Sequence, residues 1–491
     1  MSDVPQRHPM TLGIDLGTSA IKVAAVGPDG AVIGEAAANF PTSCSLPQQA
    51  EQVPSDWLHA VSSAMCTLGD TLRGAGGSLG QVAAIGLTGQ LPTLVCLSAD
   101  APLAPAITWK DGRADAWAAA RVDAACRARM YASTGMPIDG RYLAPMFRFH
   151  FSDRADEIQC ILSAKDYLLW ALTGLRLTEP STAAGYGIFD LQARRFSDTL
   201  AEFWNLPRRL LPELRPANSP AGPLNRAGAK LLGLPAGIPV SMGAADSVCA
   251  AYCMAGLDER VVSISFGSSA VVIGASAAPR LDPAARYLLT PHVSETWYGR
   301  EMDLLATGTG YRWLSELFGW PEGEIDRAAA GAVPGAQGIF FAPYLAGGEQ
   351  GALWNSRLQG ALFGLTLRHS RGDIARAFLE GVCYEVKRCV EVLAESTAVD
   401  SVRVSGNIVH SPGSTQMLAD ILARPVAAAP DKSPAAIGAA LLARRLLVLP
   451  GIDEGRASAP QSTRDPDPTT ARIYEALYRE YVVRAAQSIP T

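Results

Sequence analysis

The alternation of apolar and polar positions is clearest near the start of the chain. Leu12, Ile14 and Leu16 alternate with smaller or polar residues, Gly-Thr-Ser at 17–19 interrupts the run, and the same period of two resumes from Ile21. A period of two on both sides of a short glycine-containing turn is typical of a β-hairpin. The pattern therefore predicts two antiparallel strands joined at 17–19.

A second stretch, about half a chain away, has the same pattern. Residues 261–266 form one strand pattern, Gly-Ser-Ser at 267–269 forms the turn, and 270–273 form the second strand. Self-similarity at this distance predicts two related domains, each of which contributes a hairpin tip to one shared cleft. Chance similarity between two hairpins is the alternative. It is weakened by Asp246, a carboxylate in a loop of small residues just ahead of the second hairpin.

The rest of the chain alternates between buried strands and amphipathic helices. A strand is predicted at 82–87, and helices are predicted from Pro54, over 166–172, from the capping box at Ser370, and at the end of the chain. For the last helix we expect one buried face, made of Ile473, Leu477, Tyr481 and Ala485. The mixture predicts an α/β fold.

Length and charge narrow the classes of protein. A chain of 491 residues with 48% hydrophobic and 18% charged residues is long enough for two globular domains. The net charge of −5 and the absence of a dense Lys/Arg run give no reason to expect a nucleic acid or an anionic membrane as partner. The chain has no run of about 20 uncharged apolar residues, so we expect a cytoplasmic protein without a membrane segment.

The cysteine pattern indicates the same compartment. Nine cysteines are an odd, scattered set without a Cys-x-x-Cys pair, and we expect all nine to be reduced thiols in the core. The sequence also lacks His-Glu-x-x-His and a Walker-type glycine loop. A zinc site or a P-loop is therefore not expected.

The first hairpin tip has the composition of a phosphate site. Gly17 lets backbone N–H groups approach an anion, and the hydroxyl groups of Thr18 and Ser19 add donors. Asp15, at the end of a buried strand, can hold Mg²⁺ through water. An ordinary turn is the alternative, and this stretch alone does not decide between the two.

Eight motifs, taken in chain order, resemble the FGGY family of carbohydrate kinases, and within it the xylulokinases most closely. The match runs from about Thr11 to about Ala443, and its landmarks lie at 13–19, 86–90, 109–113, 165–167, 243–247, 266–269, 360–365 and 437–440. The resemblance implies two actin-like (ribonuclease H-like) α/β domains with a central cleft. It implies a sugar-binding domain at 1–247 and a nucleotide-binding domain at 248–491, with a C-terminal helix after a polar linker at 458–470.

The resemblance also implies the reaction: transfer of the γ-phosphoryl group of ATP, with Mg²⁺, to a hydroxyl group of a small sugar, such as the ketopentose xylulose. Asp246 would be the catalytic base; a loop cap is its alternative role. The substrate-binding residues implied are Gln90, Leu91, Asp111, Arg113, Asp246 and Ser247. The ATP-binding residues implied are Gly17, Thr18, Ser19, Lys22, Gly267, Ser268, Gly308, Thr309, Gly406 and Asn407, and Asp15 would bind Mg²⁺ through water. A homodimer is left open.

Two of the implied pocket segments also have structural explanations. Asp111 and Arg113 could form a surface ion pair with each other, and Trp109, which ends a strand, is expected to pack in the core. Ordinary core packing and surface pairing need no ligand. The sequence leaves these alternatives open.

The chain departs from the family pattern at four places. Gln-Leu-Pro at 90–92 replaces the Gln-Met-His usual in xylulokinases, and Asp-Ser at 246–247 replaces Asp-Asn. Gly-Glu-Gln at 348–350 replaces Gly-Glu-Arg, and Ser-Gly-Asn-Ile at 405–408 replaces Gly-Gly-Gly-Ala. Kinase chemistry is compatible with all four, but the sugar is left open, so a kinase for glycerol, ribulose or gluconate is the alternative. A sugar sensor without turnover is disfavoured, because it would need neither Asp15 nor Asp246.

Overall fold

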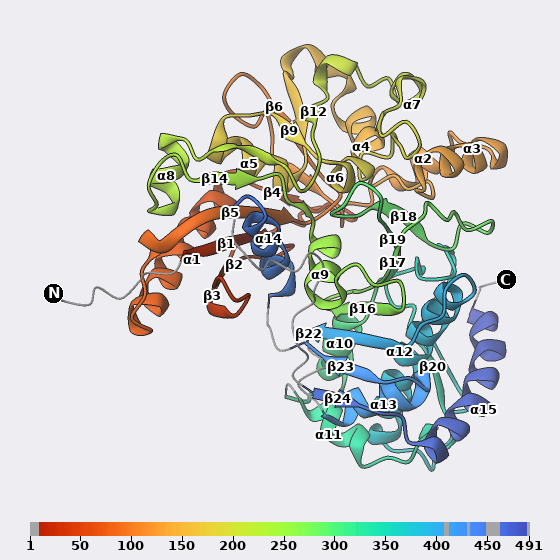
Figure 1. Ribbon diagram of the computed structural model, residues 1–491. Coiled ribbons are helices and arrows are strands. Elements are labelled where there is room, and N and C mark those ends of the chain that lie inside the picture. Colours follow the sequence, from red (N-terminus) through yellow and green to blue (C-terminus); the bar gives the residue numbers. More distant parts are fainter. Residues whose placement is uncertain (1–8, 322, 407–411, 430–432, 448–461, 489–491) are drawn as a thin grey trace.

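The computed structural model describes residues 9–321, 323–406, 412–429, 433–447 and 462–488 (Figure 1). Each half of the chain is built on a large sheet. The first sheet has the order β13-β14-β5-β1-β2-β3, with β15 beside β5. Its strands are β1 (Met10–Leu16), β2 (Ala20–Val26), β3 (Val32–Asn39), β5 (Val82–Gly89), β13 (Pro220–Pro223), β14 (Pro239–Ser241) and β15 (Ala244–Ala245).

The second sheet has the order β18-β19-β17-β16-β22-β23-β24. Its strands are β16 (Val261–Phe266), β17 (Ala270–Ser276), β18 (Leu288–Pro291), β19 (Tyr298–Leu304), β22 (Ser401–Gly406), β23 (Val426–Ala428) and β24 (Ser462–Arg464). Smaller sheets pair β4 (Glu51–Gln52), β7 (Ala106–Thr108), β6 (Thr93–Leu97) and β8 (Cys160–Leu162) in that order, β9 (Leu177–Thr178) with β12 (Glu213–Leu214), β10 (Phe189–Asp190) with β11 (Arg195–Phe196), and β20 (Phe340–Ala342) with β21 (Ala361–Phe363).

Helices surround these sheets. In the first half they are α1 (Pro54–Gly74), α2 (Asp115–Ala119), α3 (Ala124–Thr134), α4 (Leu143–His150), α5 (Ala164–Thr173), α6 (Pro180–Ala184), α7 (Asp198–Phe203) and α8 (Arg226–Leu232). From there on they are α9 (Asp246–Ala255), α10 (Gly308–Phe318), α11 (Glu324–Ala330), α12 (Arg371–Ala394), α13 (Pro412–Leu422), α14 (Pro434–Arg444) and α15 (Pro468–Ala485).

The two large sheets repeat one topology. Both predicted hairpins form: β1 pairs with β2 and β16 pairs with β17, each antiparallel. The first strand of each hairpin also pairs in parallel with a later strand, β1 with β5 and β16 with β22. The order β3-β2-β1-β5-β14 in the first sheet thus matches β19-β17-β16-β22-β23 in the second, with the same strand directions. The internal repeat expected from the sequence is therefore present in the fold.

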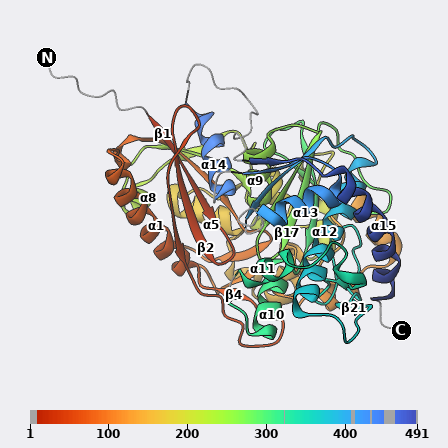
Figure 2. The same ribbon diagram turned by 90° about the horizontal axis from the view of Figure 1, so that it is seen from below.

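Two helices lie between the sheets. In Figures 1 and 2, α14, drawn in blue, lies against the red strands of the first half, next to α9. The approach of α14 to β1 is so close that a Cβ atom on Gly13 would lie 1.7 Å from the carbonyl oxygen of Ala436. Only a glycine fits there, so this glycine of the first motif is explained by helix packing.

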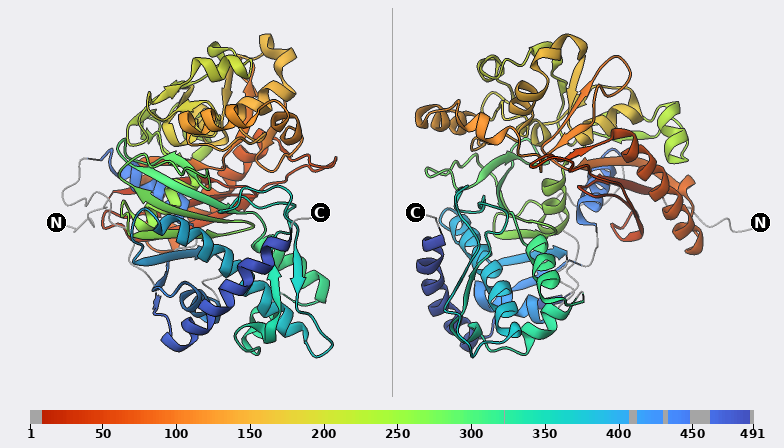
Figure 3. Two further views of the ribbon diagram at one scale, coloured as in Figure 1. Left: turned by 90° about the vertical axis from the view of Figure 1, so that its right-hand side faces the viewer. Right: turned by 180° about the vertical axis from the view of Figure 1, so that it is seen from behind.

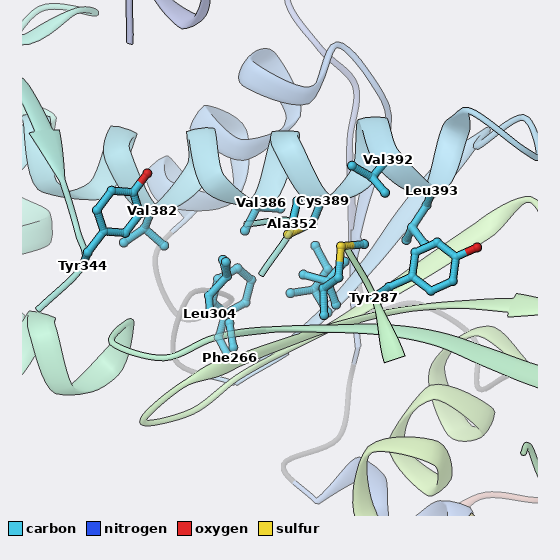
Figure 4. Packing of buried hydrophobic residues seen from close by; sticks show 14 of the residues in the cluster. Phe266, Tyr287, Leu304, Tyr344, Ala352, Val382, Val386, Cys389, Val392 and Leu393 are labelled. Carbon is cyan, nitrogen blue, oxygen red and sulfur yellow. The ribbon is translucent and has the colours of Figure 1, made fainter. Parts of the chain in front are cut away.

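Helix α12 covers one face of the second sheet. It begins with the predicted capping box, in which Ser370 Oγ accepts from the Asp373 amide at 3.2 Å and the Asp373 carboxylate accepts from the Ser370 amide at 2.8 Å. Val386 and Cys389 on this helix face Phe266 and Leu304 of the sheet side (Figure 4).

The C-terminal helix was predicted, but its buried face was partly wrong. Figure 3 shows α15 on the outside of the second half, away from the first sheet. Its buried residues are Tyr474, Tyr478, Tyr481 and Ala485, whereas Ile473 is 46% exposed. The face is rotated because Tyr474 and Tyr481 donate hydrogen bonds to the buried carboxylates of α12.

The cysteine expectation also needs a correction. All nine cysteines are free thiols, but Cys44 and Cys66 are exposed and Cys126 is half-buried, so not all of them are core residues. In the described chain, no helix combines the length and apolar character needed to cross a membrane.

Candidate active site

A cavity of about 180 Å³ lies where the two halves meet. Thr18 of the first hairpin tip and Ser269 of the second both line it, as does Asp246. The two tips, about 250 positions apart in sequence, therefore face one space, as the sequence pattern predicted. Residues of both large sheets and of the loops that connect their strands line the cavity.

Asp246 occupies the first position of α9, directly after β15. The backbone ahead of it is fixed, because the Ala245 amide donates to Ser181 Oγ at 2.9 Å. The Asp246 carboxylate accepts from the amide of Ser247 at 2.9 Å. Burial raises the pKa of Asp246 to about 7, and the nearby carboxylate of Asp15 adds to this rise. The position combines a fixed backbone with a carboxylate that exchanges protons near neutral pH.

A buried glutamate, Glu179, supports the segment before Asp246 through Ser181. Glu179 is fully buried and accepts hydrogen bonds from the Ser181 hydroxyl and from the amides of Ser181 and Thr182, all within 2.9 Å. Because Ser181 Oγ donates to Glu179, its lone pairs are left to accept from Ala245. Glu179 therefore orients the group that holds the segment before Asp246.

Two hydrogen bonds fix Thr18 of the first tip at the cavity. The carbonyl of Thr18 accepts from Gln52 Nε2 at 2.8 Å, and Thr18 Oγ1 accepts from Trp109 Nε1 at 3.1 Å. Trp109 is thus half-buried and lines the cavity, whereas we expected core packing. The Gly17 amide donates to the Ala20 carbonyl across the turn at 3.1 Å.

Asp15 lies in β1, two residues before Gly17, and pairs with Lys22 across the hairpin. Burial raises the pKa of Asp15 to about 6, although the Lys22 ammonium opposes the rise. Its Oδ1 atom is buried and has no hydrogen-bond partner within the described residues. Ser19, at the end of the tip, is exposed.

The second tip packs on the start of α10. The Gly308 amide donates to the Gly267 carbonyl at 3.1 Å, and the Thr309 amide donates to the Ser268 carbonyl at 3.0 Å. A Cβ atom on Gly308 would lie 2.2 Å from the Gly267 carbonyl oxygen, so this approach requires glycine. Gly406 ends β22 beside Phe266. Four of the predicted ATP-binding residues thus meet with Gly406 at one place, while Asn407 lies outside the described residues.

The structure brings only some of the predicted substrate residues to the cavity. Leu91, Asp246 and Ser247 line it. Gln90 is not among the lining residues. It is buried, and its Nε2 donates to Gln52 Oε1 at 2.8 Å.

Asp111 and Arg113 pair with each other away from the cavity lining. Arg113 Nη2 lies 2.6 Å from Asp111 Oδ2 and 2.6 Å from Glu51 Oε1, and Asp111 also accepts from the Ala50 amide. The ion-pair alternative describes this geometry, with the difference that Asp111 is buried.

Several polar residues of the cavity were not predicted. Asp139 and Arg141 come from the loop after α3, and Glu301 and Asp303 come from β19. Glu301 and Asp303 stand two positions apart in a strand whose other side chains are mostly buried, which is the signal that could have identified them. Gln350 and Trp354 complete the lining from a later loop.

The charges of these residues influence one another. Burial raises the pKa of Asp303 to about 6, although Arg141 opposes this. Burial and the carboxylate of Asp303 also raise the pKa of Glu301. Burial alone would raise the pKa of Asp139, but the guanidinium of Arg141 lowers it. Within the described ranges, no cluster of three or more His, Cys, Asp or Glu side chains could hold a metal ion by protein ligands alone.

Comparison with known proteins identifies the family of the chain. The N-terminal domain model of the FGGY family of carbohydrate kinases matches residues 10–253, and the C-terminal domain model matches residues 262–447. A xylulose kinase of Escherichia coli is 31% identical over 422 residues, which cover 84% of either chain.

Solved structures show the same fold. A ligand-bound xylulose kinase from Lactobacillus acidophilus superposes with a TM-score of 0.89 at 23% identity, covering 97% of this chain and 98% of the other. A gluconate kinase from the same species reaches 0.88 at 23% identity, with 98% of each chain covered. Both support a two-domain, actin-like α/β architecture. The family models and the Escherichia coli relative together establish that this chain belongs to the FGGY family of carbohydrate kinases and is an ATP-dependent sugar kinase.

Proposed function

We propose that the cavity between the two halves holds a small sugar, and that Asp246 is the general base for transfer of the γ-phosphoryl group to one of its hydroxyl groups. The observation that carries this proposal is the meeting of Thr18, Ser269 and Asp246 around one space. Its volume of about 180 Å³ is below the roughly 300–1,000 Å³ of sites for drug-sized ligands. A single small sugar suits this volume better than an oligosaccharide.

In the proposed reaction, Asp246 accepts the proton of the attacking hydroxyl group while the hydroxyl oxygen bonds to the γ-phosphorus. The bond from that phosphorus to the bridging oxygen breaks, and ADP leaves with the electron pair. A base with a pKa of about 7 is well matched to this task, because about half of it is ionised at neutral pH and the ionised form is basic enough to take the proton. The remaining catalysis is positioning and charge stabilisation.

The two hairpin tips supply the positioning. On the first tip we assign Gly17, Thr18 and Ser19, with Lys22 behind them, to phosphate binding. On the second tip we assign Gly267 and Ser268, together with Gly308, Thr309 and Gly406 around them. Backbone N–H groups, hydroxyl groups and a helix start are suited to phosphate oxygens. We assign sugar binding mainly to a domain at 1–247 and nucleotide binding mainly to a domain at 248–491, with the first hairpin tip reaching the phosphates from the sugar-binding side.

The residues present are compatible with Mg²⁺. The buried Oδ1 of Asp15 has no hydrogen-bond partner in the described part of the chain and is therefore available to an ion-bound water. Mg²⁺ usually keeps several waters and is held by one or two carboxylates together with substrate phosphates, so a complete protein cage is not needed. The bound ion would neutralise phosphate charge. Asp15 would hold it through water.

The relatives support a first candidate for the sugar. The Escherichia coli relative is a xylulose kinase, so a ketopentose is the first candidate, with glycerol, ribulose and gluconate as alternatives. From the charge and cysteine content we place the enzyme in the cytoplasm.

An ADP-release assay coupled to NADH oxidation, run with pentuloses, hexuloses, polyols and aldonates, tests the assignment. We expect sugar-dependent ADP release from at least one small compound and its loss in Asp246→Asn. The proposal fails if no member of the panel is phosphorylated, or if Asp246→Asn keeps the turnover of the wild type.

A further inference from the structure

The charges around the cavity are unequal. Four carboxylates line it, whereas Arg141 is the one cation among the described residues that do so. The carboxylates are those of Asp139, Asp246, Glu301 and Asp303. Asp139 and Arg141 belong to the first half of the chain and form an ion pair, so the excess of carboxyl groups over cations in the lining comes from Asp246, Glu301 and Asp303. The lining therefore offers a bound molecule several carboxyl oxygens that can accept hydrogen bonds.

The cation is already neutralised. Arg141 Nε donates to Asp139 Oδ1 at 2.8 Å and its Nη2 donates to Asp139 Oδ2 at 2.5 Å, a bidentate pair. The side chains are only 19% and 10% exposed. Asp139 also accepts from Gln350 Nε2 at 2.7 Å. The pair uses Nε and Nη2 and offsets the charge of the guanidinium, so a second carboxylate would meet Arg141 only through Nη1 and against the charge of Asp139.

Asp303 is oriented for a donor. Its Oδ1 atom is buried and makes no hydrogen bond with any described residue. It stands on β19 opposite Val271, and both residues line the cavity. A buried carboxylate oxygen without a partner is satisfied by a hydroxyl group, which donates, and is repelled by a second carboxylate, which does not.

We propose that the phosphoryl acceptor is an uncharged polyhydroxy compound, and that Asp303, together with the Asp139–Arg141 pair, excludes sugar acids from the cavity. This inference rests on the proposed assignment of the cavity as the sugar site. It removes gluconate and other aldonates from the alternatives, although a gluconate kinase shares the fold. The fold is common to both, but the charge of the lining is a property of these side chains.

The test compares three acceptors that differ in one group. The best neutral polyol or ketose from the panel is matched with the aldonate and with the 1-amino-1-deoxy compound of the same carbon stereochemistry. We expect the neutral compound to exceed the aldonate in kcat/KM by at least about a hundredfold, because a buried like charge costs far more than one hydrogen bond. The ammonium compound should bind better than the aldonate in competition against the neutral substrate.

Two variants at one position separate charge from shape. Asp303→Asn removes the charge and should reduce the preference for the neutral compound over the aldonate by about tenfold or more, because one full repulsion across about 4 Å at an effective dielectric near 20 corresponds to roughly a thousandfold. Asp303→Glu keeps the charge and should keep the preference, even if turnover falls. Glu202→Gln, which removes an exposed carboxylate on α7 outside the cavity lining, is the matched control. Thermal unfolding checks that each variant is folded.

The outcomes are distinct. An aldonate used within about threefold of its neutral partner, or an unchanged preference in folded Asp303→Asn, overturns this inference and leaves the proposed function standing. No turnover with any member of the panel overturns the proposed function and this inference with it.

Discussion

The side-chain amide of Gln350 donates to Asp139 Oδ2 at 2.7 Å, and the two residues belong to opposite halves of the molecule. Both ends of this bond are fixed. Asp139 is held by Arg141, and Gln350 is held by the buried Glu349, which accepts from the amides of Gln350 and Leu305. Because Asp139 and Gln350 are each anchored within their own half, the bond between them forms only when the two halves are close together. It therefore joins the two halves at the lining of the cavity that we propose as the sugar site.

We first predict that Gln350→Glu weakens sugar binding by favouring an open cleft. The new carboxylate faces Asp139, and like charges at this distance repel strongly when partly buried. The KM for the sugar should rise by about tenfold or more, with a smaller change in the KM for ATP. Small-angle scattering with both substrates bound should give a larger radius of gyration than for the wild type.

Gln350→Arg is the matched control, because it restores the residue usual in the family and places a positive charge near Asp139. It should leave closure intact. Wild-type scattering and a wild-type KM in Gln350→Glu would show that this bond does not report closure.

The hairpins and helix starts were predictable because their signals are local. Alternation of burial over two residues is visible in the sequence of β1 and β16, and the Ser370 capping box lies within four residues. The repeated sheet follows from the two hairpins. The rotated face of α15 was not predictable, since it depends on buried carboxylates that α12 presents from about 90 positions away.

The composition of the cavity could not be predicted for the same reason. Asp139 and Gln350 meet only after both halves have folded, and nothing near either residue in sequence indicates the other. Resemblance to the family placed Asp111 and Arg113 at the sugar, yet their charges are used by each other and by Glu51. Motif position identifies a segment, whereas the hydrogen-bond partners of each side chain decide which of its residues face the ligand.

The second prediction concerns Asp246→Asn. The amide keeps the shape of the carboxylate but cannot accept the proton of the attacking hydroxyl group, so kcat should fall by about two to four orders of magnitude, while calorimetric sugar binding remains within a few-fold. In the wild type, kcat/KM should fall as the pH drops below about 7, because protonation of Asp246 removes the base. A variant with more than a tenth of wild-type turnover would exclude this role.

The third prediction uses the same carboxylate to test stability. The folded-state pKa of Asp246 is raised to about 7 from an ordinary value of 3.8, so the folded state binds the proton more tightly than the unfolded state. Its contribution to stability is therefore complete below pH of about 4 and is lost as the pH rises to about 7. Asp246→Asn lacks this loss. It should melt at a higher temperature than the wild type at pH 8 and at a similar temperature at pH 4.5. The control is the difference in melting temperature between Glu202→Gln and the wild type at the same two pH values. A difference that does not change with pH would contradict the raised pKa.

The last prediction is that D-xylulose is a poor substrate and that another small sugar is used better. At the position where xylulokinases usually have histidine, this chain has Pro92, which lines the cavity beside Leu91. Leu91 packs tightly over Gly185, where an added Cβ atom would lie 2.6 Å from its Cδ1, so this wall is apolar and fixed. Proline has no N–H to replace the missing imidazole. A site that hydrogen-bonds a hydroxyl group discriminates strongly, and without the donor that discrimination is lost.

Another side chain could restore the contact, and Asp111 or Arg113 would be the nearest candidates in the sequence. Their geometry argues against it, because Arg113 bridges Asp111 and Glu51, and the Asp111 carboxylate also accepts from the Ala50 amide. Moving either one into the cavity would leave a buried charge unpaired. Steady-state kinetics over the sugar panel should therefore place D-xylulose below another neutral sugar in kcat/KM, and the double variant Leu91→Met/Pro92→His should raise D-xylulose relative to that sugar. The highest kcat/KM for D-xylulose in the unmodified enzyme would instead mean that the apolar wall does not contact the substrate where the histidine would.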